Sequence, residues 1–301
     1  MHNLSENFSK ISMIVNQILA KDLNSEGNIP KPGRNPKYSD AKVISLALTA
    51  EVSEVDSEYR FFINLSENYR SIFPDLIHRT QFNRRRKALF YWINTVREKL
   101  VNIMEPQSNR HIVDSMPLAI CKFSRAKRLK ICQEEPISAP AYGFCAAQNI
   151  HYFGYKFHAV CSVSGVVKNF DLSKANHHDI KYLEDIRELF PGTELLGDLG
   201  YRSGPLQLEL FEVNDIELIT PMRSNEKNYQ PQNPLNRRQR KRIETMFSQF
   251  IDFLNLTKNY AKSFVGLAAR ILTKITSFTI LQYFNILNGR PLNHVKHAIY
   301  F

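Results

Sequence analysis

The sequence predicts an α/β protein, in which a mixed sheet with helices packed on it follows an all-helical region. Two observations carry this prediction. Apolar residues recur at helical spacing within residues 1–108, and short apolar runs alternate with helical segments after His111. The length of 301 residues allows one large core plus a smaller unit. We therefore divide the chain into a helical N-terminal region, 1–108, and an α/β region with C-terminal helices, 109–301.

The N-terminal region contains two well-marked helices. Ser39 is a suitable N-cap for a helix over 40–51, because a serine oxygen accepts a hydrogen bond from a free N–H of the first turn. A later helix is predicted by apolar residues three and four positions apart, namely Leu89, Ile93, Val96 and Leu100. The Pro- and Gly-rich stretch 29–36 separates the first helix from the next.

The α/β region begins with a short apolar run, His111 to Asp114, which ends on a carboxylate. Two further runs, 155–163 and 166–172, are joined by Ser164-Gly165, which favours a hairpin. The segment 122–148 is longer than an ordinary hairpin loop, and such long loops are usually functional or disordered. The remaining elements are predicted as a helix over 179–189, a strand over 194–197, a helix over 206–213 and a strand over 216–220.

Two more helices are predicted toward the C-terminus. One starts near Arg237 and carries Glu244 at the edge of its apolar stripe. The other covers the most apolar stretch, 263–288, with Arg270 and Lys274 near its middle. Each of these cations would cost about 2.5–3.5 kcal/mol at the centre of a bilayer. We therefore expect a buried helix, and no membrane partner.

The charge of the chain points to a polyanionic partner. Lys and Arg number 40 against 29 Asp and Glu, which gives a net charge of +11. The basic residues concentrate in three clusters, at 84–87, 122–130 and 237–242. Such clusters suit a phosphate backbone, and the binding they support falls steeply with salt. Solubility alone is the other explanation for the excess charge.

The compartment is predicted from two features. The residues after Met1 show no basic segment followed by an apolar one, so no secretory signal is visible. The four cysteines have irregular spacing without a Cys-x-x-Cys pair, which indicates reduced thiols and neither a zinc site nor a disulfide framework. We expect a cytoplasmic protein.

Three carboxylates have positions that can converge. Asp114 ends the first strand, Asp198 ends the strand over 194–197, and Glu244 lies on a helix beside the sheet. Carboxylates gathered in one place repel one another, and divalent cations such as Mg²⁺ remove that penalty. Two such ions would support in-line phosphoryl transfer on nucleic acid. By local sequence alone, Asp198 also fits an ordinary turn, and Arg240 with Glu244 fits a solvated ion pair.

Several motifs together resemble the DDE transposases of bacterial insertion sequences, and most closely the insertion sequence 982 family. The resemblance covers the chain from about Tyr38 to the C-terminus. The motifs are Val113-Asp114-Ser115, Tyr155-Lys-Phe-His158, Asn176-His-His-Asp179, Asp198-Leu-Gly-Tyr201, Arg240-x-x-x-Glu244, Ala269–Thr276 and Gln282-Tyr-Phe-Asn285. The wider group has a Tyr-Arg-Glu-Lys signature, of which this chain keeps the arginine and glutamate but has Arg237 and Ile251 at the outer positions.

The resemblance implies an RNase H-like catalytic domain in which Asp114, Asp198 and Glu244 hold two Mg²⁺ ions, with Mn²⁺ as a substitute. The implied reaction is hydrolysis at the transposon end, followed by attack of the freed 3′-hydroxyl on target DNA. The implied partners are the terminal inverted repeats, target DNA and further copies of the chain on DNA. The helical N-terminal region is the part expected to bind the repeats, and the setting is the bacterial cytoplasm.

The expected DNA contacts are basic residues of the clusters and of one strand. They are Arg84, Arg85, Arg86, Lys127, Arg128, Lys156, Arg237, Arg240 and Lys241. Lys156 also fits the plain polar face of a strand. Two further residues stay open: Tyr201 between packing and DNA contact, and His178 between the site and a loop that caps the helix at Asp179.

Two other functions are compatible with the sequence. An RNase H-like nuclease or junction resolvase would cut DNA without joining it. A non-catalytic DNA-binding remnant of a transposase would bind DNA without cutting, although the presence of all three carboxylates weighs against a decayed site.

Overall fold

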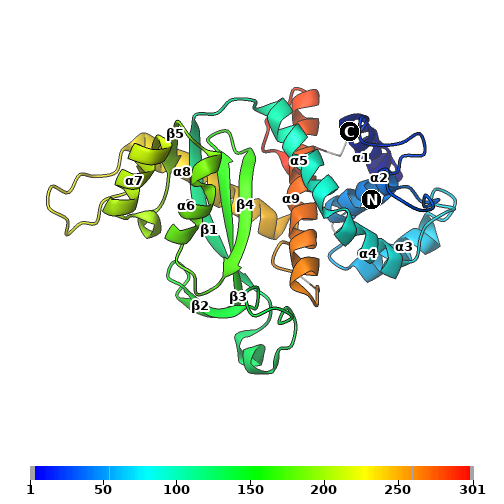
Figure 1. Cartoon of the computed structure of the whole chain (residues 1–301), viewed down its shortest axis with the longest axis horizontal. Helices are drawn as coiled ribbons and strands as arrows, with labels where there is room; N and C mark the ends of the chain where they lie inside the picture. Colours follow the sequence, from blue (N-terminus) through cyan, green and yellow to red (C-terminus); the bar gives the residue numbers. More distant parts are fainter. Residues whose placement is uncertain (1–3, 54, 259, 299–301) are drawn as a thin grey trace. The chain divides into compact units, whose positions relative to one another are not determined.

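The computed structural model describes residues 4–53, 55–258 and 260–298. Residues 1–3, part of the N-terminal segment considered above for a secretory signal, lie outside the described residues. The contacts between residues divide the chain into two units (Figure 1). The first unit, called the helical unit below, consists of Met1–Met104 and Phe250–Phe301. The second, called the sheet unit, consists of Glu105–Gln249.

The helical unit is built from helices that bury one face each. Ser39 caps α2 as expected, because its side chain accepts a hydrogen bond from the N–H of Lys42. The helices of this unit are α1 (Leu4–Ile18), α2 (Asp40–Val52), α3 (Glu58–Asn68), α4 (Arg79–Ala88), α5 (Phe90–Met104), α9 (Phe264–Leu287) and the 3₁₀ turn η4 (Val295–His297). The helix predicted from Leu89 to Leu100 is thus α5, and Ile93, Val96 and Leu100 are fully buried.

Helix α9 is the buried centre of the helical unit and runs beside α5 (Figure 1). Of the described residues, this one helix is long and apolar enough to cross a membrane by length and composition, and 83% of its most apolar window is buried within the protein. Arg270 and Lys274 are both buried on it, and both pair with Glu51 of α2. The expectation of a buried helix is confirmed for 264–287.

The sheet unit contains one mixed sheet of six strands. The strands lie in the order β2-β3-β1-β5-β6, and β4 pairs with β3. Strand β1 is antiparallel to β3 and parallel to β5, which is itself parallel to β6. The strands are β1 (Arg110–Ala119), β2 (Ala141–Cys145), β3 (Ile150–Ser162), β4 (Val167–Lys174), β5 (Thr193–Leu196) and β6 (Ile216–Ile219). The predicted hairpin at Ser164-Gly165 joins β3 to β4.

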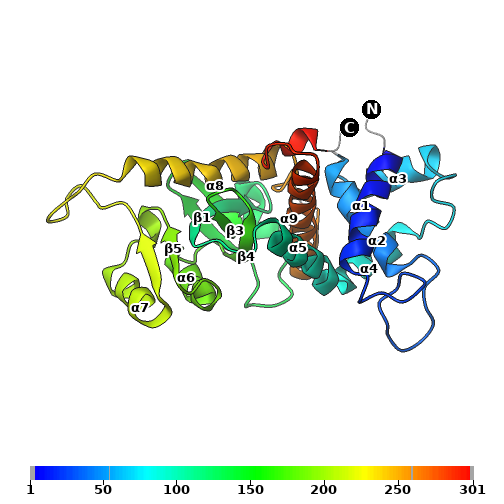
Figure 2. The ribbon, with the colours of Figure 1, turned by 90° about the horizontal axis from the view of Figure 1, so that it is seen from above.

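Helices cover both faces of this sheet (Figure 2). On one face, α6 (Ile180–Ile186) and α7 (Gly204–Asn214) pack on Val113 and Val160, and the turn η2 (Arg187–Leu189) follows α6. On the other face lies α8 (Pro234–Asp252), whose Phe247 meets Phe157 of β3 with ring centroids 6.0 Å apart. The predicted α/β fold with a mixed sheet, flanking helices and a helical N-terminal region is confirmed.

Two features of the sheet unit differ from the sequence prediction. Strand β1 does not end at Asp114 but continues to Ala119, because β3 pairs with it along its whole length from His111 to Ala119. The segment 122–148 is not a plain loop, since it contains the 3₁₀ turn η1 (Phe123–Arg128) and β2. Strand β2 adds to β3 beyond the end of β4, and so extends the sheet at residues that no apolar run marked.

The boundary between the units also differs from the division predicted from sequence. The C-terminal segment from Phe250 groups with the N-terminal helices rather than with the sheet. The physical reason is burial: α9 is apolar around most of its circumference and packs on α5 and α2. An all-round apolar helix needs partners on several sides. Whether 1–108 and 109–301 are separate functional domains stays a prediction.

Candidate active site

Asp114 lies within β1, and Asp198 follows the end of the neighbouring parallel strand β5. In the register of β1 with β5, Ile112 lies opposite Leu196. Asp114 follows Ile112 by two residues, and Asp198 follows Leu196 by two residues. Side chains two residues apart in an extended chain share a face. Adjacent strands lie about 4.8 Å apart. The two carboxylates therefore start from neighbouring points on the face of the sheet that α8 covers.

The backbone around Asp198 makes a short turn as well as presenting a carboxylate. Asp198 is the N-cap of the 3₁₀ turn η3 (Leu199–Tyr201), and its Oδ1 accepts a hydrogen bond of 2.8 Å from the N–H of Gly200. A Cβ at Gly200 would lie 3.0 Å from that same oxygen, so a side chain there would crowd the carboxylate. The turn and the presented carboxylate thus coexist, and Oδ2 keeps its lone pairs for another partner.

Glu244 reaches the same region from α8. Its neighbour Ile243 is fully buried, and Arg110 of β1 donates a 2.6 Å hydrogen bond to Asn236, so α8 is held against the sheet. Glu244 itself is exposed. Its negative charge acts on the carboxyl of Asp114.

The electrostatics of Asp114 reflect this convergence. Burial raises the pKa of Asp114 to about 7, and the charges of Asp198 and Glu244 push it in the same direction. The N–H of Ser115, which donates to Asp114 Oδ1 at 2.8 Å, and the guanidinium of Arg240 oppose the rise. An added cation would stabilise the ionised form of this carboxyl, because it would offset the repulsion from two further carboxylates.

The donor set fits a hard divalent cation, although the side chains are not gathered around one point. Within the part of the chain that the structure describes, no three His, Cys, Asp or Glu side chains lie close enough together to hold a metal ion. Carboxylate oxygens are the ligands that Mg²⁺ prefers. Burial is the main cause of the raised pKa of Asp114, and the charges of Asp198 and Glu244 add to it. The chemistry of the set therefore fits Mg²⁺.

Arg240 lies at the carboxylates rather than out on the surface. Its Nη2 is 4.0 Å from Asp114 Oδ2, and its side chain is 17% exposed. Among the described residues its Nε has no hydrogen-bond partner. Arg240 precedes Glu244 by one turn of α8, so both groups face the same region. The other two basic residues predicted on this helix, Arg237 and Lys241, are exposed.

Asp179 is a fourth carboxylate beside this region that sequence reasoning did not name as a site residue. Its Oδ1 accepts hydrogen bonds from Ser115 Oγ at 2.7 Å and from Lys156 Nζ at 3.1 Å. Asp179 also lies near the turn that presents Asp198. A Cβ at Gly200 in that turn would be 3.6 Å from Asp179 Oδ2. The motif Asn176-His-His-Asp179 was the signal that could have found it.

Lys156 is held inside the protein by this contact. Its side chain is 16% exposed and its ammonium group pairs with Asp179. Lys156 therefore makes a specific ion pair rather than lying on a plain polar face, and its contact with DNA stays a prediction. His178 is exposed and lines a pocket with Lys156, His151 and His177, away from the position of Glu244 on α8. Burial and neighbouring lysines lower the pKa of His177.

Tyr201 belongs to the core. It is 1% exposed and packs in the cluster that contains Val113 and Leu195. Burial raises its pKa, and the charges of Asp179, Asp114 and Asp198 add to the rise. Of the two alternatives that the sequence left open, the structure therefore favours packing.

The remaining predicted DNA contacts divide into exposed and internal residues. Lys127 and Arg128 are exposed on η1, and Arg84 is exposed on α4. Arg85 instead pairs with Asp40 at 2.6 Å, and Arg86 is 4% exposed and pairs with Glu58 at 3.2 Å. The basic run on α4 thus holds the helical unit together and also presents the exposed Arg84 at the surface.

The sheet order and the paired carboxylates define the class of protein: an α/β fold of the RNase H-like kind, with an acidic site on its parallel strands. Within that class, residues 107–263 match the family of transposase DDE domains. The match covers more than half of the chain, so the chain belongs to this family. Comparisons with curated proteins and with solved structures found no match. The protein is thus a transposase, an enzyme of the polynucleotidyl transferase kind, with DNA as its partner.

Proposed function

We propose that the protein is a transposase of a bacterial insertion sequence similar to the insertion sequence 982 family. It cleaves DNA at the transposon ends in a metal-dependent reaction and transfers the freed 3′-hydroxyl into target DNA. The observation that carries the proposal is the matching position of Asp114 and Asp198 on parallel strands, with Glu244 acting on the same carboxyl. The family match over residues 107–263 supports it.

Asp114, Asp198 and Glu244 are the proposed ligands of two Mg²⁺ ions, with Mn²⁺ as a substitute. When bound, the ions would activate a water or hydroxyl and stabilise the leaving oxygen of the phosphodiester. Members of this class generally use divalent metals. Asp114 comes from a strand, Asp198 from the turn directly after a strand, and Glu244 from a helix, so regular elements support all three.

Arg240 has a proposed role at the reacting phosphate. Its Nη2 lies 4.0 Å from Asp114 Oδ2, and its Nε has no hydrogen-bond partner within the described residues. When a cation takes over the neutralisation of Asp114, the guanidinium is free to bind a phosphate oxygen in its forked geometry. Asp179 has a proposed positioning role, because it ties Ser115, the residue after Asp114, to Lys156.

The proposed DNA contacts at the surface are five exposed cations among the residues predicted from sequence: Arg84, Lys127, Arg128, Arg237 and Lys241. The terminal inverted repeats are the proposed partner of the helical N-terminal region, and target DNA the partner of the acidic site. A homo-oligomer on DNA would bring two ends together. The bacterial cytoplasm is the proposed location.

The test uses purified full-length protein, Mg²⁺, and DNA that carries the inverted repeats flanking the coding region. A transposase gives 3′-hydroxyl ends and then a product in which those ends are joined to a second DNA. A nuclease or resolvase gives ends without joined product. A remnant binds DNA and gives neither. Joined product that depends on the divalent ion supports the proposal, and either of the other two results overturns it.

A further inference from the structure

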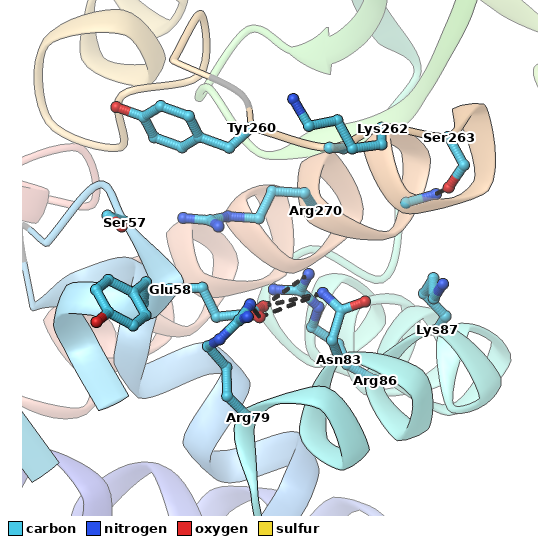
Figure 3. Close-up of a pocket in the computed structure, with 13 residues that line it drawn as sticks. Ser57, Glu58, Arg79, Asn83, Arg86, Lys87, Tyr260, Lys262, Ser263 and Arg270 are labelled. Carbon is cyan, nitrogen blue, oxygen red and sulfur yellow. Dashed lines mark hydrogen bonds and ion pairs between the residues drawn. The ribbon is translucent and has the colours of Figure 1, made fainter. Parts of the chain in front are cut away.

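The helical unit contains a pocket that is separate from the acidic site (Figure 3). Its volume is about 330 Å³, and α3, α4 and the segment leading into α9 line it. The charged residues of its wall are Glu58, Arg79, Arg86, Lys87, Lys262 and Arg270. Five of the six are cations, so the pocket is strongly basic.

The one carboxylate in this wall is already fully engaged. Glu58 pairs with Arg79 at 3.5 Å and with Arg86 at 3.2 Å. Its two oxygens also accept hydrogen bonds of 3.3 and 3.1 Å from Asn83. Figure 3 draws these interactions as dashed lines that converge on the Glu58 carboxylate. Glu58 therefore has little capacity left to neutralise the other cations of the wall.

A second carboxylate lies beneath the wall and is shared in the same way. Glu51 binds Arg270 at 2.6 Å and Lys274 at 2.7 Å. The cations Arg86, Arg270 and Lys274 are all at least nine-tenths buried, and their ion pairs within the described residues are with Glu51 and Glu58. In the part of the chain that the structure describes, three buried cations thus share two carboxylates, and burial of charge without full compensation is costly.

Two of these cations, Arg86 and Arg270, line the pocket itself. The Nε of Arg86 has no hydrogen-bond partner among the described residues. Figure 3 shows the Arg270 side chain extending between Tyr260 and Glu58. At the rim, neither Lys87 nor Lys262 has an ion-pair partner in the described part of the chain.

The helix ends around the pocket add to its preference for anions. Ser57 is the N-cap of α3 and Ser263 is the N-cap of α9, and both serines line the pocket. Helix N-termini carry a partial positive charge and present free N–H groups. Cations and helix N-termini around one pocket together favour a compact anion with several oxygens.

We propose that this pocket binds a phosphate group. Arginine guanidinium groups suit phosphate because they donate two parallel hydrogen bonds, and the lysines at the rim add point charge. The proposal rests in part on the proposed function, which makes the DNA backbone the expected source of the phosphate. A contact of that kind fixes the position of a duplex without reading its bases. Free phosphate or pyrophosphate is the other source.

The test compares two double variants of the full-length protein. The pocket variant is K87Q/K262Q, and the control variant is K21Q/K296Q, which removes two exposed lysines of the same unit that lie outside the pocket. Both keep the buried ion pairs, and equal melting temperatures without ligand show that both fold. One arm measures the rise in melting temperature with pyrophosphate in EDTA. The other arm measures the affinity for labelled end DNA at several salt concentrations.

We expect pyrophosphate to stabilise the unmutated protein and the control variant, and not the pocket variant. We also expect the pocket variant to bind DNA about tenfold more weakly, with a salt slope smaller by about one, because one phosphate contact is lost. If only the pyrophosphate effect is lost, free phosphate is the source and the pocket proposal stands.

If the pocket variant matches the control in both arms, the proposal is overturned. Neither arm requires cleavage or joining. A protein that shows the pyrophosphate effect but forms no joined product would therefore contradict the proposed function and leave the pocket proposal intact.

Discussion

Asp198 shows why a single residue supports two readings of the sequence. Its Oδ1 closes the turn by accepting the N–H of Gly200, as an Asp before a Gly often does. The register of β1 with β5 places the same side chain beside Asp114. The turn was predictable from local residue types. The neighbouring position of Asp114 was not, because it depends on a strand pairing across more than 80 residues.

Asp179 is the residue whose environment the sequence could not give. Its partners Ser115 and Lys156 lie 64 and 23 residues away along the chain. It stands at the N-cap position of α6, yet its side chain makes no capping hydrogen bond there. A local pattern at a helix start predicts a cap, whereas the actual partners come from β1 and β3.

Two buried histidines make the stability of the protein sensitive to acid. Burial lowers the pKa of His111 and of His158 to about 4, against an ordinary value near 6.5. The folded protein thus keeps both rings neutral where the unfolded chain takes up protons. Their stability contribution is complete above pH 6.5 and is lost as the pH falls from 6.5 toward 4.

We expect H158Q to reduce this acid sensitivity. Since a tenfold change in proton affinity corresponds to about 1.4 kcal/mol, the His158 contribution amounts to about 3 kcal/mol over that range. Glutamine can keep the contact with Ser173, which His158 Nε2 makes at 2.7 Å. Urea unfolding at pH 7.5 and pH 5 measures the effect. An equal loss of stability on acidification in the variant and the unmutated protein would contradict this account.

At the level of elements, an ion pair joins β3 to the N-cap of α6. Lys156 Nζ lies 3.1 Å from Asp179 Oδ1, and both side chains are mostly buried. We expect K156M to lower the free energy of unfolding by about 1–3 kcal/mol, because Asp179 loses a charged donor. Urea unfolding measures this loss.

Lys127 provides the control for that variant. It is exposed on η1 and was predicted, like Lys156, to contact DNA. K127M should change the free energy of unfolding by less than about 0.5 kcal/mol. If the two variants have equal stability, the ion pair with Asp179 does not hold the elements together.

The packing of α9 on α2 depends on a buried carboxylate. Glu51 binds Arg270 and Lys274, and burial alone would raise its pKa, but the two cations hold the pKa below its ordinary value. We expect E51Q to destabilise the protein by about 3–5 kcal/mol, because it leaves buried cations without a counter-charge. Urea unfolding tests this.

Glu6 is the matched control for Glu51. It pairs with Lys10 on the exposed face of α1 at 2.7 Å, with a side chain that is 50% exposed. E6Q should lower the free energy of unfolding by less than about 0.5 kcal/mol, because water screens an ion pair at the surface. A small effect for E51Q, similar to that of E6Q, would show that the buried cluster contributes little.

The elements themselves were largely predictable, and their grouping was not. Apolar spacing located helices such as α5, α6 and α8, because each has a local period. The overall apolarity of 263–288 located α9, and Ser164-Gly165 between two apolar runs located the β3–β4 hairpin. Strand β2 escaped prediction, since its residues alternate between partly and largely exposed positions. The grouping of α9 with the N-terminal helices depends on tertiary packing across the chain, which no local period encodes.

For the whole molecule, the net charge of +11 pointed correctly to DNA as the partner of a transposase. The net charge did not identify which cations are available to bind DNA. Arg85 and Arg86 are engaged in ion pairs, whereas Arg84 beside them is exposed. Composition counts a buried cation and an exposed one equally, so burial had to come from the structure.

The central claim is that Asp114, Asp198 and Glu244 act together in catalysis. The most direct measurement is strand transfer by the single variants D114N, D198N and E244Q, with DNA binding and melting temperature measured in parallel. Each variant keeps the size of the side chain and removes its charge. We predict that each lowers joined product by at least about a thousandfold, as loss of a group essential to electrostatic stabilisation does, while DNA affinity and melting temperature do not fall. Joined product at the unmutated level from any one of the three would contradict the account.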